Sequence, residues 1–463
     1  MAGAVRVRQS PSRLILGSRL VVLENAGHAP FDEREDVLSM PFTISLSDSA
    51  RQSCRFLLQP IYNKPHRVGG GLGAHKENAW GMRVEQVVIG VVAVAVWVYL
   101  IAFRGGFWNI KRGDRVPSVS SSRRIVAVIP ARDEADVIGG AVASLLAQDY
   151  AGLLDIVVVD DHSADGTADA ARTATETAGA GHRVNVVAAD TMPRGWTGKL
   201  WAVRQGIVIA SQLRPDYLLL TDADIVHAPD NLRGLVARAE TGGYDLVSLM
   251  VRLHCRGFWE RLLVPAFVFF FFKLYPPRWV ADSTRDIAAA AGGCMLVRRE
   301  TLEQIGGVDS IRHEIIDDCA LARRVKSVGR VWLGAAEETH SVRPYGSWRT
   351  LWDMIARCAF AQLNYSPATL GVLITGMAVT YLAPPLLLLS GDKVAMLLGG
   401  AAWITMGASF LPILRAYHCS PLVAPLLPLI ALFYMAATIG SAVQFWRGRG
   451  GAWKGRFQAA ALR

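Results

Sequence analysis

The strongest constraint on this chain is the uneven distribution of its apolar residues. Of its 463 residues, 52% are hydrophobic and only 19% are charged. The apolar residues concentrate in one run near residue 90 and in a block from about residue 367 to residue 445. The stretch between them has the mixed composition of a soluble α/β domain. Because a bilayer-spanning helix needs about 20 consecutive apolar residues, this pattern predicts a folded domain held between membrane segments.

Charge and cysteine content exclude several classes of protein. The net charge is +10, but no basic stripe interleaved with aromatic residues is present, so we expect no nucleic-acid partner. Much of the excess lies in the first 81 residues and in the tail, where basic flanks attract anionic lipid head groups. The six cysteines form no CxxC pair, so neither a zinc site nor a disulfide framework is indicated.

The N-terminal region has two parts. Residues 1–81 carry Arg, Ser, Gly and Pro without periodicity, and we expect a disordered leader or a mis-assigned upstream extension, since Met82 looks like a natural start. Residues 82–104 are expected to form a transmembrane helix, because Val87 to Phe103 is uncharged for 17 residues and a basic cluster follows. That cluster places the next segment in the cytoplasm. A buried helix of a soluble domain is the alternative.

The middle of the chain, residues 105–345, alternates strand and helix signals. Short β-rich runs separated by helical stretches predict an α/β fold with a mainly parallel sheet and helices on both faces. In such sheets ligands bind beyond the carboxyl ends of the strands. We predict strands at 125–129, 156–159, 184–188 and 217–220, and helices at 136–148 and 167–177.

Polar residues follow three of these strands. Pro130 follows the first, and we expect the strand to stop there because proline cannot continue a central ladder. Asp160 and Asp161 follow the second, where a carboxylate can accept hydrogen bonds from a nucleobase or a ribose. The neighbouring Ser163 and Asp165 can instead cap the next helix. Asp222 and Asp224 follow another strand, and two carboxylates at this spacing can hold Mg²⁺ or Mn²⁺ against a diphosphate.

Taken together, Pro130–Glu134, Asp160–Ser163 and Asp222–Asp224 resemble the family 2 glycosyltransferases with the GT-A fold, over about residues 124–345. The resemblance implies that Asp222 and Asp224 bind the metal and the diphosphate. It also implies that Lys199 contacts the donor, with a solvated lysine as the alternative. The full set of expected donor-binding residues is Ala131, Arg132, Glu134, Asp160, Asp161, Lys199, Asp222 and Asp224.

Asp317 and Asp318 resemble the family's Glu-Asp motif, with Asp in place of Glu. By position, Asp318 is the expected catalytic base, which takes the proton from the acceptor hydroxyl in a single inverting displacement. The alternative is that both residues only favour a helix N-terminus; Glu314 is a second candidate base. Expected acceptor-side residues are Gly292, Gly293, Cys294, Asp317 and Arg357, although the glycines also suit a plain turn.

Processive members of the family carry Gln-x-x-Arg-Trp after the base motif, and here only Arg357 remains, which favours addition of a single hexose or N-acetylhexosamine. The chain more closely resembles the hopanoid-biosynthesis glycosyltransferases of bacteria, through residues 131–136, 195–199, 316–322 and 343–347. That resemblance implies a multi-pass protein of the bacterial inner membrane with a cytoplasmic catalytic domain and a lipid acceptor. Transfer to a polyprenyl phosphate, or a non-catalytic membrane scaffold, are the alternatives.

The membrane-facing segments leave two questions open. Leu262 to Phe272 is 11 apolar residues long, too short to span, and is expected to lie at the interface or to be a buried core helix. We expect residues 346–366 to contain an interfacial helix, residues 367–445 about three transmembrane helices, and residues 446–463 a basic tail. Three spans would export that tail, against the positive-inside rule, so one segment is re-entrant or the count is wrong.

Overall fold

The computed structural model describes residues 73–109, 122–453 and 456–457. The expected disordered or extraneous leader therefore lies, up to residue 72, outside the described residues. The first described element is α2 (Gly73–Ala102), which begins before the expected boundary at residue 82. Its segment Arg83–Ala102 is long and apolar enough to cross a membrane.

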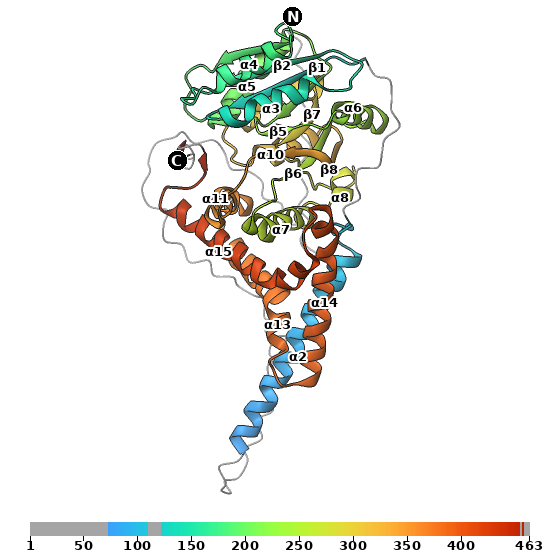
Figure 1. The fold of residues 1–463 in the computed structure, drawn as a ribbon. Helices are drawn as coiled ribbons and strands as arrows, with labels where there is room; N and C mark the ends of the chain where they lie inside the picture. Colours follow the sequence, from blue (N-terminus) through green and yellow to red (C-terminus); the bar gives the residue numbers. More distant parts are fainter. Residues whose placement is uncertain (1–72, 110–121, 454–455, 458–463) are drawn as a thin grey trace, which may run out of the picture. The chain divides into compact units, whose positions relative to one another are not determined.

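The domain that follows is built on one eight-stranded sheet with the order β3-β2-β1-β4-β7-β6-β8-β5 (Figure 1). β3, β2, β1 and β4 are parallel, β7 is antiparallel to β4 and β6, and β6 is parallel to β8. This confirms the expected α/β, GT-A-like fold. The strands are β1 (Ile125–Ala131), β2 (Leu154–Asp160), β3 (Val184–Ala188), β4 (Tyr217–Thr221), β5 (Ile225–Val226), β6 (Leu246–Arg252), β7 (Cys294–Arg298) and β8 (Val331–Ser341).

Helices cover both faces of the sheet, which explains why the strands are continuous apolar runs. In β1, Ile125, Ala127 and Ile129 face one buried cluster, and Val126 and Val128 face the other. The helices of the domain are α3 (Ala135–Leu146), α4 (Thr167–Thr177), α5 (Gly198–Ser211), α6 (Asn231–Gly242), α8 (Pro277–Ala281), α9 (Arg299–Gln304), η1 (Gly307–Ile311) and α10 (Asp317–Lys326).

β1 does not stop at Pro130 as expected. It continues to Ala131, and Pro130 lies opposite Val159 of β2. Ala131 O accepts a hydrogen bond from Asp161 N, so the polar groups of Ala131 face β2 and those of Pro130 face the other neighbour. Pairing with that neighbour, β4, has already ended at Val128. The missing N–H of Pro130 therefore costs the sheet no hydrogen bond.

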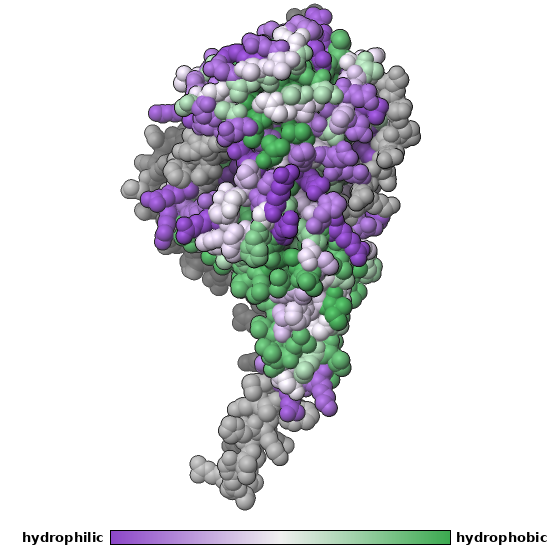
Figure 2. Space-filling view, viewed as in Figure 1, coloured by the Kyte–Doolittle hydropathy of each residue, from purple (hydrophilic) through white to green (hydrophobic). Residues whose placement is uncertain are grey.

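The C-terminal block is a set of apolar helices whose exposed side chains are mostly hydrophobic, as the green surface in Figure 2 shows. By length and composition, three stretches could cross a membrane: Pro367–Leu387, Lys393–Ala416 and Pro421–Trp446. Together with α2, they indicate membrane association. The elements are α12 (Pro367–Met377), η3 (Ala378–Leu382), α13 (Ala383–Leu387), α14 (Lys393–Ala416), η4 (Pro421–Leu426) and α15 (Leu427–Trp446); β9 (Ala452–Trp453) and β10 (Arg456–Phe457) follow them.

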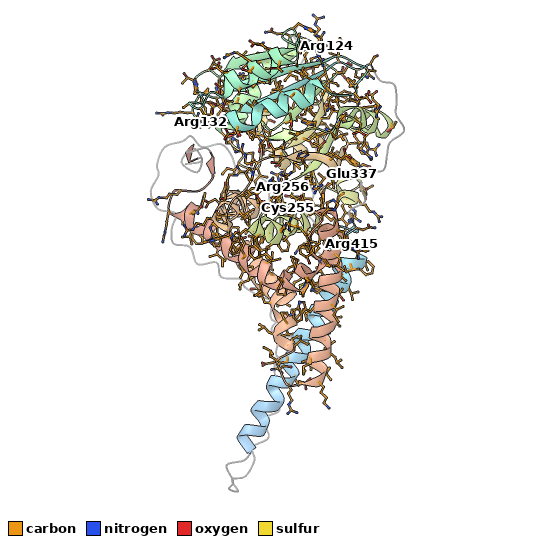
Figure 3. All side chains as sticks on the ribbon, viewed as in Figure 1. Arg124, Arg132, Cys255, Arg256, Glu337 and Arg415 are labelled. Atoms are coloured by element: carbon orange, nitrogen blue, oxygen red, sulfur yellow. The ribbon has the colours of Figure 1, made fainter. Side chains whose placement is uncertain are left out.

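Two helices join the sheet domain to this block: α7 (Phe258–Leu274) and α11 (Trp348–Cys358), the second followed by η2 (Ala361–Leu363). Figure 3 shows Cys255 and Arg256 at the start of α7, between the sheet and the apolar helices. Phe269 is fully buried, and its ring packs edge-on against Phe107 and Phe410. The apolar stretch of α7 is therefore mainly a buried core helix, which agrees with the second of the two alternatives for Leu262 to Phe272.

Candidate active site

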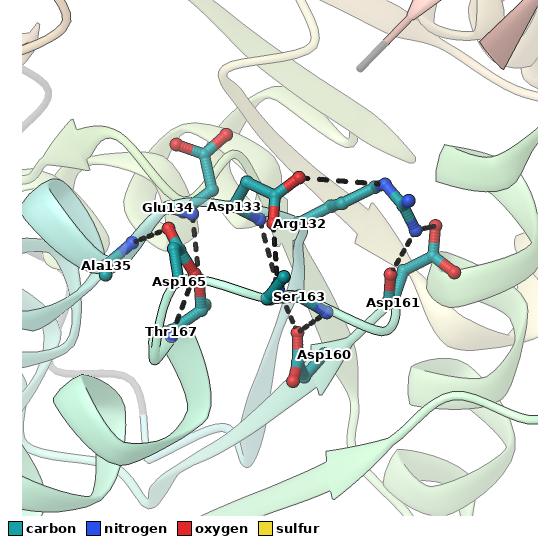
Figure 4. A network of polar contacts seen from close by, with 10 residues as sticks. Arg132, Asp133, Glu134, Ala135, Asp160, Asp161, Ser163, Asp165 and Thr167 are labelled. Carbon is teal, nitrogen blue, oxygen red and sulfur yellow. Dashed lines mark hydrogen bonds and ion pairs between the residues drawn. The ribbon is translucent and has the colours of Figure 1, made fainter. Parts of the chain in front are cut away.

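The donor side of the site lies where β1 and β2 end. A network of short polar contacts joins the two loops there (Figure 4). Asp160 Oδ1 accepts hydrogen bonds from the backbone N–H and the hydroxyl of Ser163, and Asp165 accepts from Ala135 N and Thr167 N at 2.9 and 3.0 Å. Asp160, Ser163 and Asp165 therefore hold the loops in place. These bonds use Oδ1 of Asp160, and the expected contact of Asp160 with the donor stays a prediction.

Asp161 differs from its neighbour because its side chain is buried, with 1% of its surface exposed. Arg132 Nη1 donates to the Asp161 carbonyl oxygen and lies 3.5 Å from Asp161 Oδ2 (Figure 4). The Nε of Arg132 is buried and makes no hydrogen bond to any described residue. Its nearest acceptor is Asp133 Oδ2 at 4.0 Å, an ion pair without a hydrogen bond, so this N–H can still donate to a polar ligand at this edge.

Glu134 and Asp224 are connected by a residue that the sequence did not single out as a site residue. Arg343, just after β8, is ion-paired with Glu134, and its Nε lies 3.5 Å from Asp224 Oδ2. Ser341 Oγ donates to the same Asp224 oxygen at 2.6 Å. Burial and the charge of Asp222 raise the pKa of Asp224 above its ordinary value. The hydrogen bond from Ser341 and the charge of Lys199 oppose part of that shift.

Lys199 lies at the centre of the site. Its Nζ is 2.9 Å from Asp222 Oδ1 and 3.4 Å from Asp317 Oδ2. It is positioned near the start of α5, where the side chain of Thr197 caps the helix. Burial lowers the pKa of Lys199, but the two carboxylates outweigh burial and raise it, so the ammonium stays charged. Lys199 is therefore not the solvated lysine of the alternative interpretation.

Asp318 faces Lys199 across Gly292. Its Oδ2 accepts a hydrogen bond from Gly292 N at 2.9 Å, and its Oδ1 accepts from Cys319 N at 2.7 Å. Burial and the neighbouring charge of Asp317 raise the pKa of Asp318 to about 6. A Cβ on Gly292 would lie 3.2 Å from Lys199 Nζ and 3.4 Å from Asp318 Oδ2. Gly292 is thus needed for this close approach, rather than for a turn alone.

The other residues that were expected on the acceptor side differ in burial and in their contacts. Cys294 is fully buried in β7, where its sulfur lies 3.7 Å from Asn231 Nδ2, so its side chain cannot reach an acceptor. Gly293 O accepts a hydrogen bond from the Thr221 hydroxyl, which makes this glycine a packing residue. Arg357 is exposed on α11. Burial raises the pKa of Tyr345, and the positive charge of Arg357 opposes this shift. Of the expected set, Gly292, Asp317 and Arg357 therefore remain suited to an acceptor.

Glu260, which the sequence analysis did not consider, supports the loop that carries Arg343. It is buried at the start of α7 and accepts hydrogen bonds from the backbone N–H groups of Arg256, Gly257 and Tyr345 at 2.7–2.8 Å. Although burial raises the pKa of Glu260, these bonds lower it to about 2. Its one sequence signal is an acidic residue in the first turn of an apolar helix.

The resemblance to the glycosyltransferases implies a divalent cation, and two residues of the site can supply part of its coordination. Asp222 and Asp224 supply carboxylate oxygens, the ligands that Mg²⁺ and Mn²⁺ prefer. No group of three or more His, Cys, Asp and Glu residues suited to a metal occurs in the described ranges. The protein would therefore contribute these two side chains, with the donor and water completing the coordination. The contact between Lys199 Nζ and Asp222 Oδ1 shows that this carboxylate already pairs with a positive charge.

Comparison with known proteins defines the class of the chain. The model of glycosyl transferase family 2 matches residues 126–306, and that of glycosyl transferase family group 2 matches residues 217–440. The chain is a glycosyltransferase. The two matches include the ends of β1, β2 and β4 and support family 2 as the family of its catalytic domain. No curated protein matches the chain.

Among solved structures, the chain is similar to a mannosyltransferase from Pyrobaculum calidifontis in complex with GDP-mannose and Mn²⁺, with 20% identity, 79% of this chain and 98% of that chain covered, and a TM-score of 0.45. It is also similar to glucosyl-3-phosphoglycerate synthase from Mycobacterium tuberculosis, with 18% identity, 52% and 80% of the two chains covered, and a TM-score of 0.34. A third is mannosyl-3-phosphoglycerate synthase from Rubrobacter xylanophilus, with 18% identity, 52% and 75% covered, and a TM-score of 0.32.

Proposed function

We propose that this glycosyltransferase moves a single sugar from a UDP-sugar to a lipid acceptor, with inversion, at the surface of the bacterial inner membrane. The observation that carries the proposal is the position of Lys199, which contacts Asp222 on the donor side and Asp317 on the acceptor side within 3.4 Å. Lys199 therefore lies between Asp222, which is expected to hold the cation and the diphosphate, and Asp317, which precedes the candidate base Asp318.

On the donor side, Asp161 and Arg132 are suited to the nucleoside, through a carboxylate and a guanidinium whose Nε makes an ion pair with Asp133 but no hydrogen bond to any described residue. Lys199 can contact the diphosphate as a charged donor. A divalent cation at Asp222 and Asp224 would neutralise the charge that develops on the leaving diphosphate. No general acid is required opposite the base, because the leaving group departs without protonation.

On the acceptor side, Asp318 serves as the base. A carboxylate with a pKa of about 6 is ionised at neutral pH yet more basic than an ordinary aspartate, which favours proton removal from a hydroxyl. The N–H of Gly292 fixes the position of its Oδ2. The oxygen that loses its proton then attacks the anomeric carbon on the face opposite the leaving group, which inverts that centre.

The lipid nature of the acceptor is supported by where the site lies. The loop that follows β8 carries Arg343 into the site, and α11 begins five residues later, at Trp348. One face of α11 is buried against α15, and its other face is exposed and carries Arg357. Burial and the charge of Asp318 both raise the pKa of Cys358, the last residue of α11, so a lipid hydroxyl held beside this helix would lie on the side of Asp318. We propose a hopanoid or related lipid as the acceptor and the cytoplasm as the side of the catalytic domain.

Reconstitution tests this proposal. The full chain in lipid nanodiscs is incubated with UDP-hexose or UDP-N-acetylhexosamine, Mn²⁺ or Mg²⁺, and a hopanoid polyol, and the lipids are analysed by mass spectrometry. We expect one sugar increment on the polyol, none with Asp318→Asn, and normal product with Asp309→Asn, an exposed aspartate paired with Arg204. Product with polyprenyl phosphate alone would replace the hopanoid by that acceptor. Sugar transfer to neither lipid would overturn the lipid acceptor.

A further inference from the structure

The C-terminal segment Pro421–Trp446 is apolar enough to cross a membrane, yet it starts beside the sheet domain and ends beside α11. It starts just after α14, where Tyr417 Oη accepts a hydrogen bond from Leu253 N at 3.2 Å. Cys419 Sγ lies 3.7 Å from Cys255 Sγ in the same loop of the domain. The chain therefore returns from the membrane to the domain before this segment begins.

The segment then descends only part of the way along α14. Trp403 Nε1 donates to Pro425 O at 3.1 Å, and Gly407 approaches Ala424. Trp403 is 13 residues before the end of α14 at Ala416, which is about 20 Å along a helix of about 36 Å. η4 thus reaches roughly the middle of α14 and goes no further along it.

α15 carries the chain back to the domain. Tyr434 Oη donates to Leu263 O of α7 at 2.9 Å, and its ring packs against Phe270. Further along, Ser441 Oγ donates to Ala356 O of α11 and accepts a hydrogen bond from Phe360 N. Figure 1 shows α15 running obliquely beneath α7 and α11, while α2 and α14 run alongside each other.

The backbone of this hairpin suits a non-aqueous setting. A turn inside hydrocarbon must satisfy its own polar groups, and each unsatisfied group costs several kcal/mol. Pro421, Pro425 and Pro428 carry no N–H, which removes three donors from the turn. Trp403 supplies a partner for the carbonyl of Pro425. The turn therefore needs little help from water.

Charges and exposed side chains agree with a hairpin that enters one leaflet. Leu422, Leu429 and Leu432 are 78%, 65% and 48% exposed, and only acyl chains would cover them favourably. Arg415, seen near the domain in Figure 3, marks the interface at the end of α14. With a re-entrant hairpin, the basic tail from Arg447 stays on the same side as Arg415, which satisfies the positive-inside rule.

We propose that η4–α15 is a re-entrant hairpin that inserts only into the leaflet on the side of the catalytic domain, and that its partner is the acyl chains of that leaflet. The described part of the chain then crosses the membrane three times, through α2, α12–α13 and α14. The C-terminus lies on the same side as the sheet domain. This inference does not depend on which sugar or acceptor the enzyme uses.

Cysteine accessibility in sealed vesicles of both orientations tests the proposal. Single cysteines are placed by Asp309→Cys in the sheet domain, Lys393→Cys at the first residue of α14, and Arg449→Cys after α15, in a background without the native cysteines. A membrane-impermeant maleimide is the probe. We expect positions 309 and 449 to be labelled in the same vesicles, with at least a tenfold preference, and position 393 in the opposite ones.

Labelling of positions 393 and 449 from the same side would overturn the proposal, as would labelling of all three from one side. If the cysteine-free background does not fold, the native chain with a protease-cleavable C-terminal tag gives the same information. Cleavage of the tag only in vesicles whose sheet domain is also accessible to the protease supports the hairpin. Cleavage only in the opposite vesicles overturns it.

Discussion

The donor half and the acceptor half of the active site are built differently. The donor half rests on the parallel strands β1, β2 and β4, whose ends bring Arg132, Asp161 and Asp222 to one edge. The acceptor half rests on connections: Gly292 before β7 and Asp318 at the start of α10. The donor half is positioned mainly by the order of the strands, and the acceptor half depends on contacts between segments that are distant in the sequence. The two halves should therefore fail in different ways when they are altered.

The largest expected effect is on the acceptor half. Asp318→Asn keeps the shape of the side chain and can still accept the hydrogen bond from Gly292 N, but it removes the base. We expect kcat to fall by about 10²–10⁴ with little change in the KM for the donor. Steady-state kinetics over a donor series measures both, with Asp309→Asn as the control. A large rise in donor KM with unchanged kcat would place Asp318 in the donor half instead.

A somewhat smaller loss is expected from Asp224→Ala in the donor half. Removing one of two cation-binding carboxylates should reduce kcat/KM by about 100-fold and raise the Mn²⁺ concentration needed for half-maximal activity. Asp230→Ala is the matched control, since Asp230 is an exposed aspartate nearby with no capping hydrogen bond. Full activity of Asp224→Ala at low Mn²⁺ would remove Asp224 from the cation site.

Acidification should reduce kcat by about tenfold per pH unit once the pH falls below about 6. The reason is the raised pKa of Asp318, which must be ionised to accept a proton; the protonated form that accumulates below pH 6 cannot act as the base. A pH–rate profile under donor saturation checks this, and Asp318→Asn should show no such decline. An unchanged profile between pH 5 and 7 in the native enzyme would exclude Asp318 as the titrating base.

The smallest effect is expected at Arg343, which joins two carboxylates of the donor half. Arg343→Gln leaves Glu134 and Asp224 without their shared positive charge, and the excess negative charge disfavours the diphosphate. We expect donor KM to rise severalfold to about tenfold, with kcat reduced less. Arg349→Gln, on the exposed start of α11, is the control. A fall in donor KM would show instead that Arg343 blocks the empty site.

The sequence predicted the donor half better than the acceptor half, and particular residues show why. Asp161, Asp222 and Asp224 follow strands whose apolar runs are easy to recognise, and parallel pairing then brings their ends together. The contribution of Asp160 to the loop could not be predicted, because its hydrogen bonds to Ser163 depend on the conformation of that loop. Cys294 was misjudged because strand alternation turned its side chain to the core.

Arg343 and Glu260 could not be assigned from sequence because their partners are remote. Glu134 is 209 residues from Arg343, and Tyr345 is 85 residues from Glu260. No local pattern encodes either contact. The same holds for the segment 421–446, whose composition predicts a span and whose contacts with α7, α11 and α14 indicate a hairpin.

The buried position of α7 has a consequence for how this enzyme unfolds. Phe269 and Phe272 belong to a single hydrophobic cluster that also includes Val128 of the sheet and Phe410 of α14. The catalytic domain and the apolar helices therefore share one core and should melt as a single cooperative unit. If the removal of lipid loosens the apolar helices, we expect the structural change to reach the loop of Tyr345 through α7 and Glu260. We therefore expect the catalytic site to melt at a lower temperature in detergent than in a bilayer.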